Sequence, residues 1–357
     1  MTALRPCLRP LIRVRYAPPD CMLQMSPLNQ GGRGFRSSSS RRFSSGIGTP
    51  SSSNSPEQTT ATPKSSSSYM PKQSSNEVLT LHDRVKIIPL EQGIIHVLLS
   101  RPDKLNSLDI PMFEAIANAA HHLKHDTKLR KNLRAVIISG EGRAFCTGLD
   151  AKSVVLSGSP SSSLKKLLER PSAYGGENGL GNLAQDVCYL WRGLPVPVIA
   201  CLHGMCFGGG LQIALGADMR FSTPDCRLSI MESRWGLIPD MGASVTLREL
   251  LRIDVAKELT MTGRIISGAE AEKIGLVTRC VEDPMKEALK VALEIVERSP
   301  DSVAATKELF QSSWVADEET CLEKETDLQL KLIATWNQIA AAGRQFGVKL
   351  PYFLRKF

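Results

Sequence analysis

The sequence predicts an α/β fold built from repeated strand–strand–helix units and completed by a helical region. Three observations support this class. Short β-branched runs alternate with helical patterns from Val85 onward, a Gly-rich turn joins a strand to a helix near Gly208, and the pattern is helical from Ser267 to the C-terminus. Strands and helices that alternate along one chain are typical of a sheet covered by helices.

The first unit is expected to begin with a hairpin. Val85–Pro89 and Ile94–Ser100 are short β-branched runs separated by Leu90–Gly93, which places Gly at the turn. Asp109 is expected to cap the helix that follows, with Pro111 in its first turn. This helix carries apolar residues on one face, namely Phe113, Ile116, Ala119, Ala120 and Leu123.

The second unit repeats this order with a long insertion. Ala135–Ser139 predicts a buried strand, and Val196–Leu202 predicts another that leads through a Gly-rich turn into a helix from Gly208. Residues 152–182 interrupt the pattern with Ser-rich and Gly-rich stretches, which predict a mobile loop with a short helix. A long insertion in a compact domain is more often functional than not.

The last third of the chain reads as helices. Ser267 and Glu270 have the spacing of a capping box for a helix that reaches Ile274 and ends at Gly275. Three amphipathic helices are expected after it, at Met285–Arg298, Ser302–Ser313 and Glu318–Ala342.

Residues 1–76 have a different composition and are expected to lie outside the fold. They are rich in Ser, Arg and Pro, and their ten basic and two acidic residues give a net charge of +8, equal to that of the whole chain. Arg-rich, Ser-rich and acid-poor segments are typical of transit peptides, and Arg41–Ser45 resembles a mitochondrial processing site. We therefore expect a mitochondrial matrix protein with a transit peptide and Ser-rich linker. A plastid protein is the alternative, and a merely solvated tail has the same composition.

The remaining residues, 77–357, are nearly neutral, which removes the simplest argument for nucleic-acid binding. No apolar run reaches 18 residues, so no membrane span is predicted. The nine Cys are irregularly spaced and lack partners at metal-ligand spacing, so we expect no metal site and small buried thiols in a reducing compartment.

Five sequence blocks occur in a fixed order, and together they resemble the crotonase (enoyl-CoA hydratase/isomerase) family over about residues 85–350. The blocks are Arg101–Leu108, Arg143–Asp150, Pro197–Gly210, Gly236–Pro239 and Thr262–Val277. The resemblance implies a spiral of ββα units at 77–280, a C-terminal helical trimerisation region at 281–357, and homotrimers or homohexamers. It also implies a coenzyme A thioester substrate without a separate cofactor.

Chemistry at the α-carbon of a thioester gathers negative charge on the carbonyl oxygen, and fixed backbone N–H groups stabilise that charge. The Gly-rich loops Cys146–Leu149 and Phe207–Gly210 suit this task, because Gly permits close backbone approach. The helix that the second loop opens adds to the field of donors. By resemblance the donors are the N–H groups of Leu149 and Gly209, each worth about 3–4 kcal/mol of barrier. Further substrate contacts are expected at Ala144, Cys146, Gly148, Asp150, Gly208 and Gly210, and contacts with the CoA phosphates at Lys104 and Arg143.

Three residues are candidates for proton transfer. By resemblance, hydratases of the family carry a carboxylate two residues after the triple Gly, where this chain has Gln212, and a second carboxylate at the position of Glu232. An amide does not transfer protons at neutral pH, although it orients groups by hydrogen bonds. Glu232 is therefore the expected base, since burial in an apolar pocket raises a carboxyl pKa into a useful range. Asp240 resembles the second carboxylate of dienoyl-CoA isomerases, and it also suits a turn or helix cap.

These residues favour an enzyme that shifts a double bond in enoyl- or dienoyl-CoA, in fatty-acid or related catabolism. An enoyl-CoA hydratase is the alternative. An RNA-binding or non-catalytic relative fits less well, given the near-neutral charge and the two intact Gly-rich loops. We expect the insertion at 152–182 to line the acyl end of the pocket.

Overall fold

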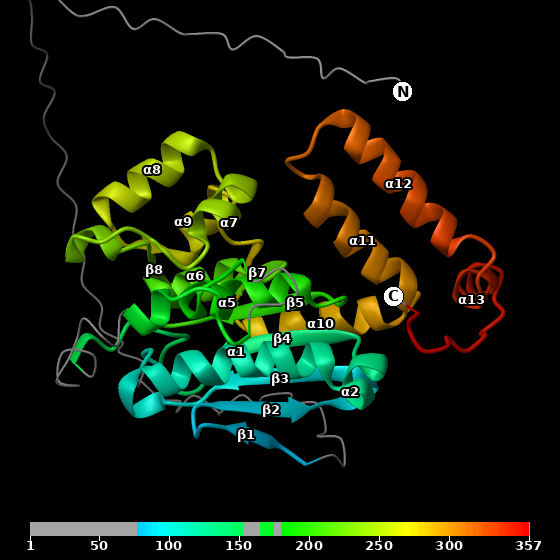
Figure 1. Ribbon diagram of the computed structural model, residues 1–357. Helices are drawn as coiled ribbons and strands as arrows, with labels where there is room; N and C mark the ends of the chain where they lie inside the picture. The colour runs from blue at the N-terminus through cyan, green and yellow to red at the C-terminus, as the bar shows by residue number, and fades with distance from the viewer. Residues whose placement is uncertain (1–76, 153–164, 175–179, 357) are drawn as a thin grey trace, which may run out of the picture. The chain divides into compact units, whose positions relative to one another are not determined.

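The computed structural model describes residues 77–152, 165–174 and 180–356, which form two sheets surrounded by helices (Figure 1). The predicted transit peptide and linker, residues 1–76, lie outside the described residues. The same holds for segments 153–164 and 175–179 of the predicted insertion.

The main sheet has seven strands in the order β1-β2-β3-β4-β5-β7-β10. Pairing is antiparallel from β1 to β3, as predicted for the hairpin, and parallel from β3 to β10. The strands are β1 (Leu79–Leu81), β2 (Val85–Pro89), β3 (Ile94–Leu99), β4 (Ala135–Gly140), β5 (Val198–Leu202), β7 (Met219–Ser222) and β10 (Arg279–Cys280). A smaller sheet joins β6 (Met205–Phe207), β8 (Arg227–Ser229) and β9 (Ile266–Ser267).

Helices cover both faces of the main sheet. On β4, Val136 and Ile138 pack into the core cluster that contains α1 (Ile110–His125), α5 (Leu183–Tyr189) and α6 (Gly209–Leu215). Their neighbours Ala135 and Ile137 pack with α10 (Pro284–Val296) on the other face. Side chains of a strand alternate between faces, so a run that is apolar at every position is buried on both sides.

The other helices belong to the loops and to the C-terminal region. They are α2 (Thr127–Asn132), α7 (Ala243–Leu250), α8 (Ile253–Thr262), α9 (Gly268–Lys273), α11 (Pro300–Ser313), α12 (Glu318–Leu332) and α13 (Trp336–Gln345), with short 3₁₀ turns at Glu91–Gly93, Pro102–Lys104, Leu190–Gly193 and Glu232–Trp235. In the part of the chain that is described, no helix combines the length and the apolar character needed to cross a bilayer.

Two sequence-based expectations about helices are wrong in detail. The single helix predicted at Glu318–Ala342 is two helices, because Ala334 has a left-handed φ of 60° and Thr335 caps α13 by accepting from the Gln338 N–H. The capping box of α9 is half formed. Ser267 accepts from the Glu270 N–H, but the Glu270 carboxylate pairs with Arg264 at 2.6 Å instead of returning to the cap.

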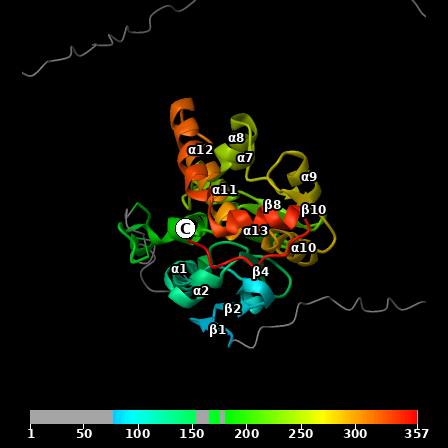
Figure 2. The ribbon, with the colours of Figure 1, turned by 90° about the vertical axis from the view of Figure 1, so that its right-hand side faces the viewer.

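The C-terminal helices expose large apolar side chains. Helices α11 and α12 lie side by side (Figures 1 and 2), and along α12 only Leu328 is buried. The final segment returns to α2, where Arg355 donates to the carbonyl oxygens of Leu133 and Arg130. Exposed apolar residues in this region include Phe310, Trp314, Leu322, Leu330, Ile333 and Phe346.

Candidate active site

The two Gly-rich loops predicted from the sequence lie against each other. The Cys146 N–H donates to the Met205 carbonyl at 3.2 Å, and the Phe207 N–H donates to the Cys146 carbonyl at 3.0 Å. A Cβ at Gly210 would lie 2.3 Å from the Cys146 oxygen, so the approach of these backbones requires a residue without a side chain. The close approach thus explains why the last residue of the second loop, Gly210, is a glycine.

The turns in both loops use backbone conformations that glycine favours. Gly148 has a φ of +81°, and Gly208 has a φ of +51° with a ψ of −124°. Residues with a Cβ are strained at such angles. The two turns direct the following amides, those of Leu149 and Gly209, out of the regular hydrogen-bonding pattern.

The N–H groups of Leu149 and Gly209 have no acceptor among the described residues. The residues on either side of Leu149 make the bonds of an isolated bridge. Gly148 accepts from the Leu108 N–H at 2.8 Å, and the Asp150 N–H donates to the Leu108 carbonyl at 3.0 Å. The Leu149 N–H therefore points away from Leu108. The Gly209 nitrogen lies 3.4 Å from the position of a Cβ on Gly148, so the two loops present bare amides beside each other.

Glu232 begins the 3₁₀ turn after β8, and its carboxyl lies beside the second loop. Glu232 Oε1 is 3.4 Å from the position of a Cβ on Gly208. Gln212 Nε2 donates to this oxygen at 2.6 Å, whereas Oε2 is buried without a hydrogen-bond partner among the described residues. Burial raises the pKa of Glu232, and the charge of Asp240 adds to the rise, while the Gln212 hydrogen bond opposes it.

Asp240 lies on the loop before α7 and is an exposed residue as a whole, although its carboxyl is partly enclosed by neighbouring groups. It makes no hydrogen bond to Glu232, although its charge acts on that carboxyl. Partial burial raises the pKa of Asp240 as well. The next residue, Met241, donates its N–H to Gln212 Oε1 at 2.9 Å, so one amide contacts both carboxylate-bearing segments. We refer to Gln212, Glu232 and Asp240 as the site cluster.

The model of one protein family, described as enoyl-CoA hydratase/isomerase, matches residues 90–345. The chain belongs to this family. The family is also called the crotonase family, and the predicted fold class is confirmed by solved structures of it. The chain is thus an acyl-CoA enzyme of the crotonase family, and the predicted relationship is confirmed.

Curated relatives and solved structures agree with this assignment. Carnitinyl-CoA dehydratase from Salmonella typhi is 31% identical over 222 residues, which cover 62% of this chain and 77% of the relative. An enoyl-CoA hydratase structure from Bacillus anthracis aligns with a TM-score of 0.66 and 25% identity, covering 76% of this chain and 99% of the other. An enoyl-CoA hydratase from Polaromonas sp. JS666 aligns with a TM-score of 0.65 and 25% identity, covering 75% and 99%.

The structure brings together only some of the residues predicted from the sequence. Ala144, Cys146, Gly148, Gly208 and Gly210 form the walls of the two loops, where burial raises the pKa of the Cys146 thiol to about 12. Because this thiol is buried and protonated, it packs in the core and does not take part in proton transfer. Lys104 and Arg143 are exposed and make no ion pair with another described residue, so their predicted contacts with CoA phosphates stay a prediction.

Asp150 has a partner that the sequence did not indicate. Arg101 Nη1 donates to Asp150 Oδ2 at 2.9 Å, and the same guanidinium lies 3.3 Å from Asp109. This bridge ties the residue after Leu149 to the cap of α1, so Arg101 helps to fix the first loop. Arg101 opens the first family block in the sequence, which was the available signal for its role.

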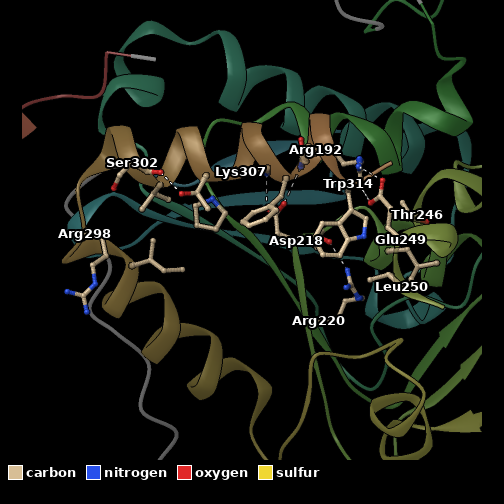
Figure 3. A pocket seen from close by; sticks show the side chains of 18 residues that line it. Arg192, Asp218, Arg220, Thr246, Glu249, Leu250, Arg298, Ser302, Lys307 and Trp314 are labelled. Carbon is tan, nitrogen blue, oxygen red and sulfur yellow. Dashed lines mark hydrogen bonds and ion pairs between the residues drawn. The ribbon is translucent and has the colours of Figure 1, made fainter. Parts of the chain in front are cut away.

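A cavity of about 650 Å³ lies between α11 and residues of α7, α10 and the segments next to β5 and β7, and none of the predicted site residues lines it (Figure 3). Arg192 makes a two-pronged ion pair with Glu249 at 2.8 and 2.9 Å, and Lys307 pairs with Asp218 at 2.7 Å. Lys307 also donates to two backbone carbonyls. We refer to this cavity, with the two ion pairs that these four residues form in its lining, as the ion-pair cavity. The Lys307–Asp218 pair joins α11 to the segment before β7, and the Arg192–Glu249 pair joins the turn Leu190–Gly193 to α7. In each pair the opposite charges compensate each other.

Within residues 77–152, 165–174 and 180–356, no group of three or more His, Cys, Asp or Glu side chains is arranged to hold a metal. The described thiols are free, and those of Cys188, Cys201 and Cys206 are buried.

Proposed function

We propose that this enzyme shifts a carbon–carbon double bond in enoyl-CoA thioesters through an enolate. Glu232 removes a proton from the α-carbon of a 3-enoyl-CoA, and the electron pair of that C–H bond forms a C1–C2 double bond while the carbonyl electron pair moves to the thioester oxygen. When the carbonyl group re-forms, the C1–C2 pair becomes the new C2–C3 double bond, and the pair of the former C3–C4 double bond takes a proton at C4 from the Glu232 carboxyl, whose proton exchanges with water, so that atoms and charges balance. The N–H groups of Leu149 and Gly209 bind the thioester oxygen while it carries negative charge.

The observation that carries this proposal is the 2.6 Å hydrogen bond from Gln212 Nε2 to Glu232 Oε1. Hydration requires activation of water and protonation of carbon, a task for which family hydratases use two carboxylates. In this chain the amide of Gln212 occupies the position of the first carboxylate, and it donates a hydrogen bond to the second carboxylate, Glu232. Isomerisation requires one proton carrier that releases and returns a proton, and Glu232 with its raised pKa suits that cycle.

Asp240 extends the proposal to conjugated dienes. In a 3,5-dienoyl-CoA the proton moves from the α-carbon to C6, too far for one carboxyl that stays in place. Asp240 acts electrostatically on Glu232 from a separate loop, so it is suited to serve the distant carbon. We propose it as the second proton carrier for such substrates.

The test is to offer the full-length chain 2-enoyl-, 3-enoyl- and 3,5-dienoyl-CoA side by side and to follow conjugation by ultraviolet absorbance. Conversion of the 3-enoyl or 3,5-dienoyl compound is expected. Rapid hydration of the 2-enoyl compound, with the other two unchanged, would overturn the proposal.

The second candidate is hydration, which the names of the similar proteins favour. It predicts that the wild-type chain adds water to 2-enoyl-CoA. Under the isomerase proposal, Gln212→Glu is expected to create or increase hydration, because it supplies the second carboxylate. Product analysis by mass spectrometry distinguishes the two, since hydration adds one water and isomerisation leaves the mass unchanged.

We further propose that the enzyme acts in the mitochondrial matrix as a homotrimer or homohexamer. The basic composition of residues 1–76 supports the location. Exposed apolar side chains on the C-terminal helices, among them Phe310 and Trp314, support association. Light scattering coupled to gel filtration tests the assembly, and import into isolated mitochondria tests the location.

A further inference from the structure

Gln212 is nearly inaccessible, with 1% of its surface exposed, and both ends of its side chain are engaged. Its Oε1 accepts from the Met241 N–H at 2.9 Å, and its Nε2 donates to Glu232 Oε1 at 2.6 Å. A backbone N–H is always a donor, so the amide oxygen must face Met241. The orientation of the amide is therefore fixed, and its nitrogen must face Glu232.

We infer that Gln212 is a positioning residue that fixes which oxygen of Glu232 carries the proton. Because Nε2 donates to Oε1, that oxygen is held as an acceptor. The other oxygen, Oε2, is buried and without a partner among the described residues, and it is the atom left to take and return the proton. The role of the proton in turnover rests on the proposed function, whereas the orientation of the carboxyl does not.

The same amide links the two carboxylate-bearing segments. Gln212 holds the peptide between Asp240 and Met241 with one end and the Glu232 carboxyl with the other. Motion of either segment is thereby coupled to α6, whose first turn carries Gln212. Asp240 stays outside this hydrogen-bond chain, and it influences Glu232 through its charge.

The lack of charge on Gln212 also matters for the titration of Glu232. An ionised carboxylate at this position would have no hydrogen to donate, and it would repel Glu232 at hydrogen-bond distance. Gln212 has the length of a glutamate but no charge. No charged side chain among the described residues therefore lies within hydrogen-bond distance of the Glu232 carboxyl, which titrates without sharing its proton.

The charges that act on this titration are few among the described residues. Burial and Asp240 raise the pKa of Glu232, whereas Gln212 and the Glu232 backbone N–H lower it. Burial raises the pKa of the Cys188 thiol far above the range in which it would ionise, and the charge of Glu232 adds to that rise. Loss of the Gln212 donor is therefore expected to shift the Glu232 midpoint to higher pH.

The experiment compares Gln212→Met with a matched control, Gln311→Met, in the full-length chain. Gln311 also donates its Nε2 to a carboxylate, that of Asp218 at 3.3 Å, but at the ion-pair cavity. Infrared spectra are recorded against pH, and the carboxylic-acid band of Glu232 is identified by its loss in Glu232→Gln. The midpoint is expected to rise in Gln212→Met and to stay at the wild-type value in Gln311→Met.

An unchanged midpoint in Gln212→Met, or an equal rise in both variants, would overturn the inference. Gln212→Leu gives the same comparison if the Met variant does not fold. With 3-enoyl-CoA, kcat of Gln212→Met is expected to fall about 10-fold or more at unchanged KM, with its acidic limb moved to higher pH. If the wild type converts no thioester, the proposed function fails, and the infrared midpoints still decide the role of Gln212.

Discussion

The site cluster and the ion-pair cavity both hold partly or fully buried charged groups, yet they differ in how those charges are satisfied. In the ion-pair cavity, Lys307 meets Asp218 and two carbonyl oxygens, and Arg192 meets both oxygens of Glu249. In the site cluster, Glu232 has a neutral partner on one oxygen and none among the described residues on the other.

This difference distinguishes charged groups that stabilise the fold from a carboxyl that is able to transfer protons. A buried ion pair offsets its own desolvation and has little tendency to exchange protons. A carboxyl with one unpartnered buried oxygen has a raised pKa and remains able to gain and lose a proton. The size and polarity of the ion-pair cavity are therefore poor guides to function, and the incompletely bonded carboxyl is the better one.

The largest expected effect is on turnover and comes from Glu232→Gln. This change keeps the size of the side chain and removes its proton chemistry, so kcat is expected to fall about 10²–10⁴-fold. Steady-state rates with 3-enoyl-CoA measure the loss, and circular dichroism checks the fold. Retained activity would mean that another residue is the base.

The ion-pair cavity is expected to respond in stability instead. Lys307→Met leaves Asp218 without its buried partner, which is expected to cost about 3–5 kcal/mol of unfolding free energy. Urea denaturation measures the cost. The double variant Lys307→Met with Asp218→Asn removes both charges and should regain much of it. Activity per folded molecule should match the wild type in both variants, and a specific loss would place this cavity in the reaction.

The contact between the two loops is tested by Gly148→Ala. The new methyl group would lie 2.8 Å from the Phe207 carbonyl at a φ of +81°, so the loops must separate. We expect about a 10- to 100-fold loss of kcat, since one amide donor is displaced. Gly347→Ala is the matched control, with the same φ of +81° and no heavy atom within 4 Å of the added carbon. It should cost about 1–3 kcal/mol in strain at most and leave kcat unchanged.

The smallest effect on simple substrates is expected from Asp240→Asn. Conversion of 3-enoyl-CoA should change by less than about 10-fold, while conversion of 3,5-dienoyl-CoA should be lost because its distant carbon needs a second proton carrier. The charge of Asp240 raises the pKa of Glu232, so its removal should move the acidic limb of kcat/KM to lower pH. Equal losses on both substrates would remove Asp240 from the proton path.

Local sequence patterns were sufficient for much of the fold. The strand at Val85–Pro89 and the cap at Asp109 are as predicted, because each depends on neighbouring residues. The break before α13 was missed because Ala334 is a residue with high helix propensity and gives no local signal. The half-formed capping box was missed because Arg264 competes for Glu270.

The candidate site was predictable as a set of residues but not as a set of contacts. The two loops were found through their glycines and their order in the chain. The bond between Gln212 and Glu232 spans 20 positions and depends on how α6 faces the turn after β8, so no local pattern could indicate it. The Met241 N–H, a backbone group, carries no residue-type signal at all.

In the proposed reaction, Glu232 exchanges a proton with the α-carbon of a thioester whose oxygen is bound by Leu149 and Gly209. The direct measurement is incubation of the full-length chain with a 3-enoyl-CoA in deuterated water, followed by mass spectrometry of the recovered acyl group. Deuterium incorporation is expected with the wild type and is expected to be lost in Glu232→Gln. Absence of incorporation in the wild type, or equal incorporation in both proteins, would contradict it.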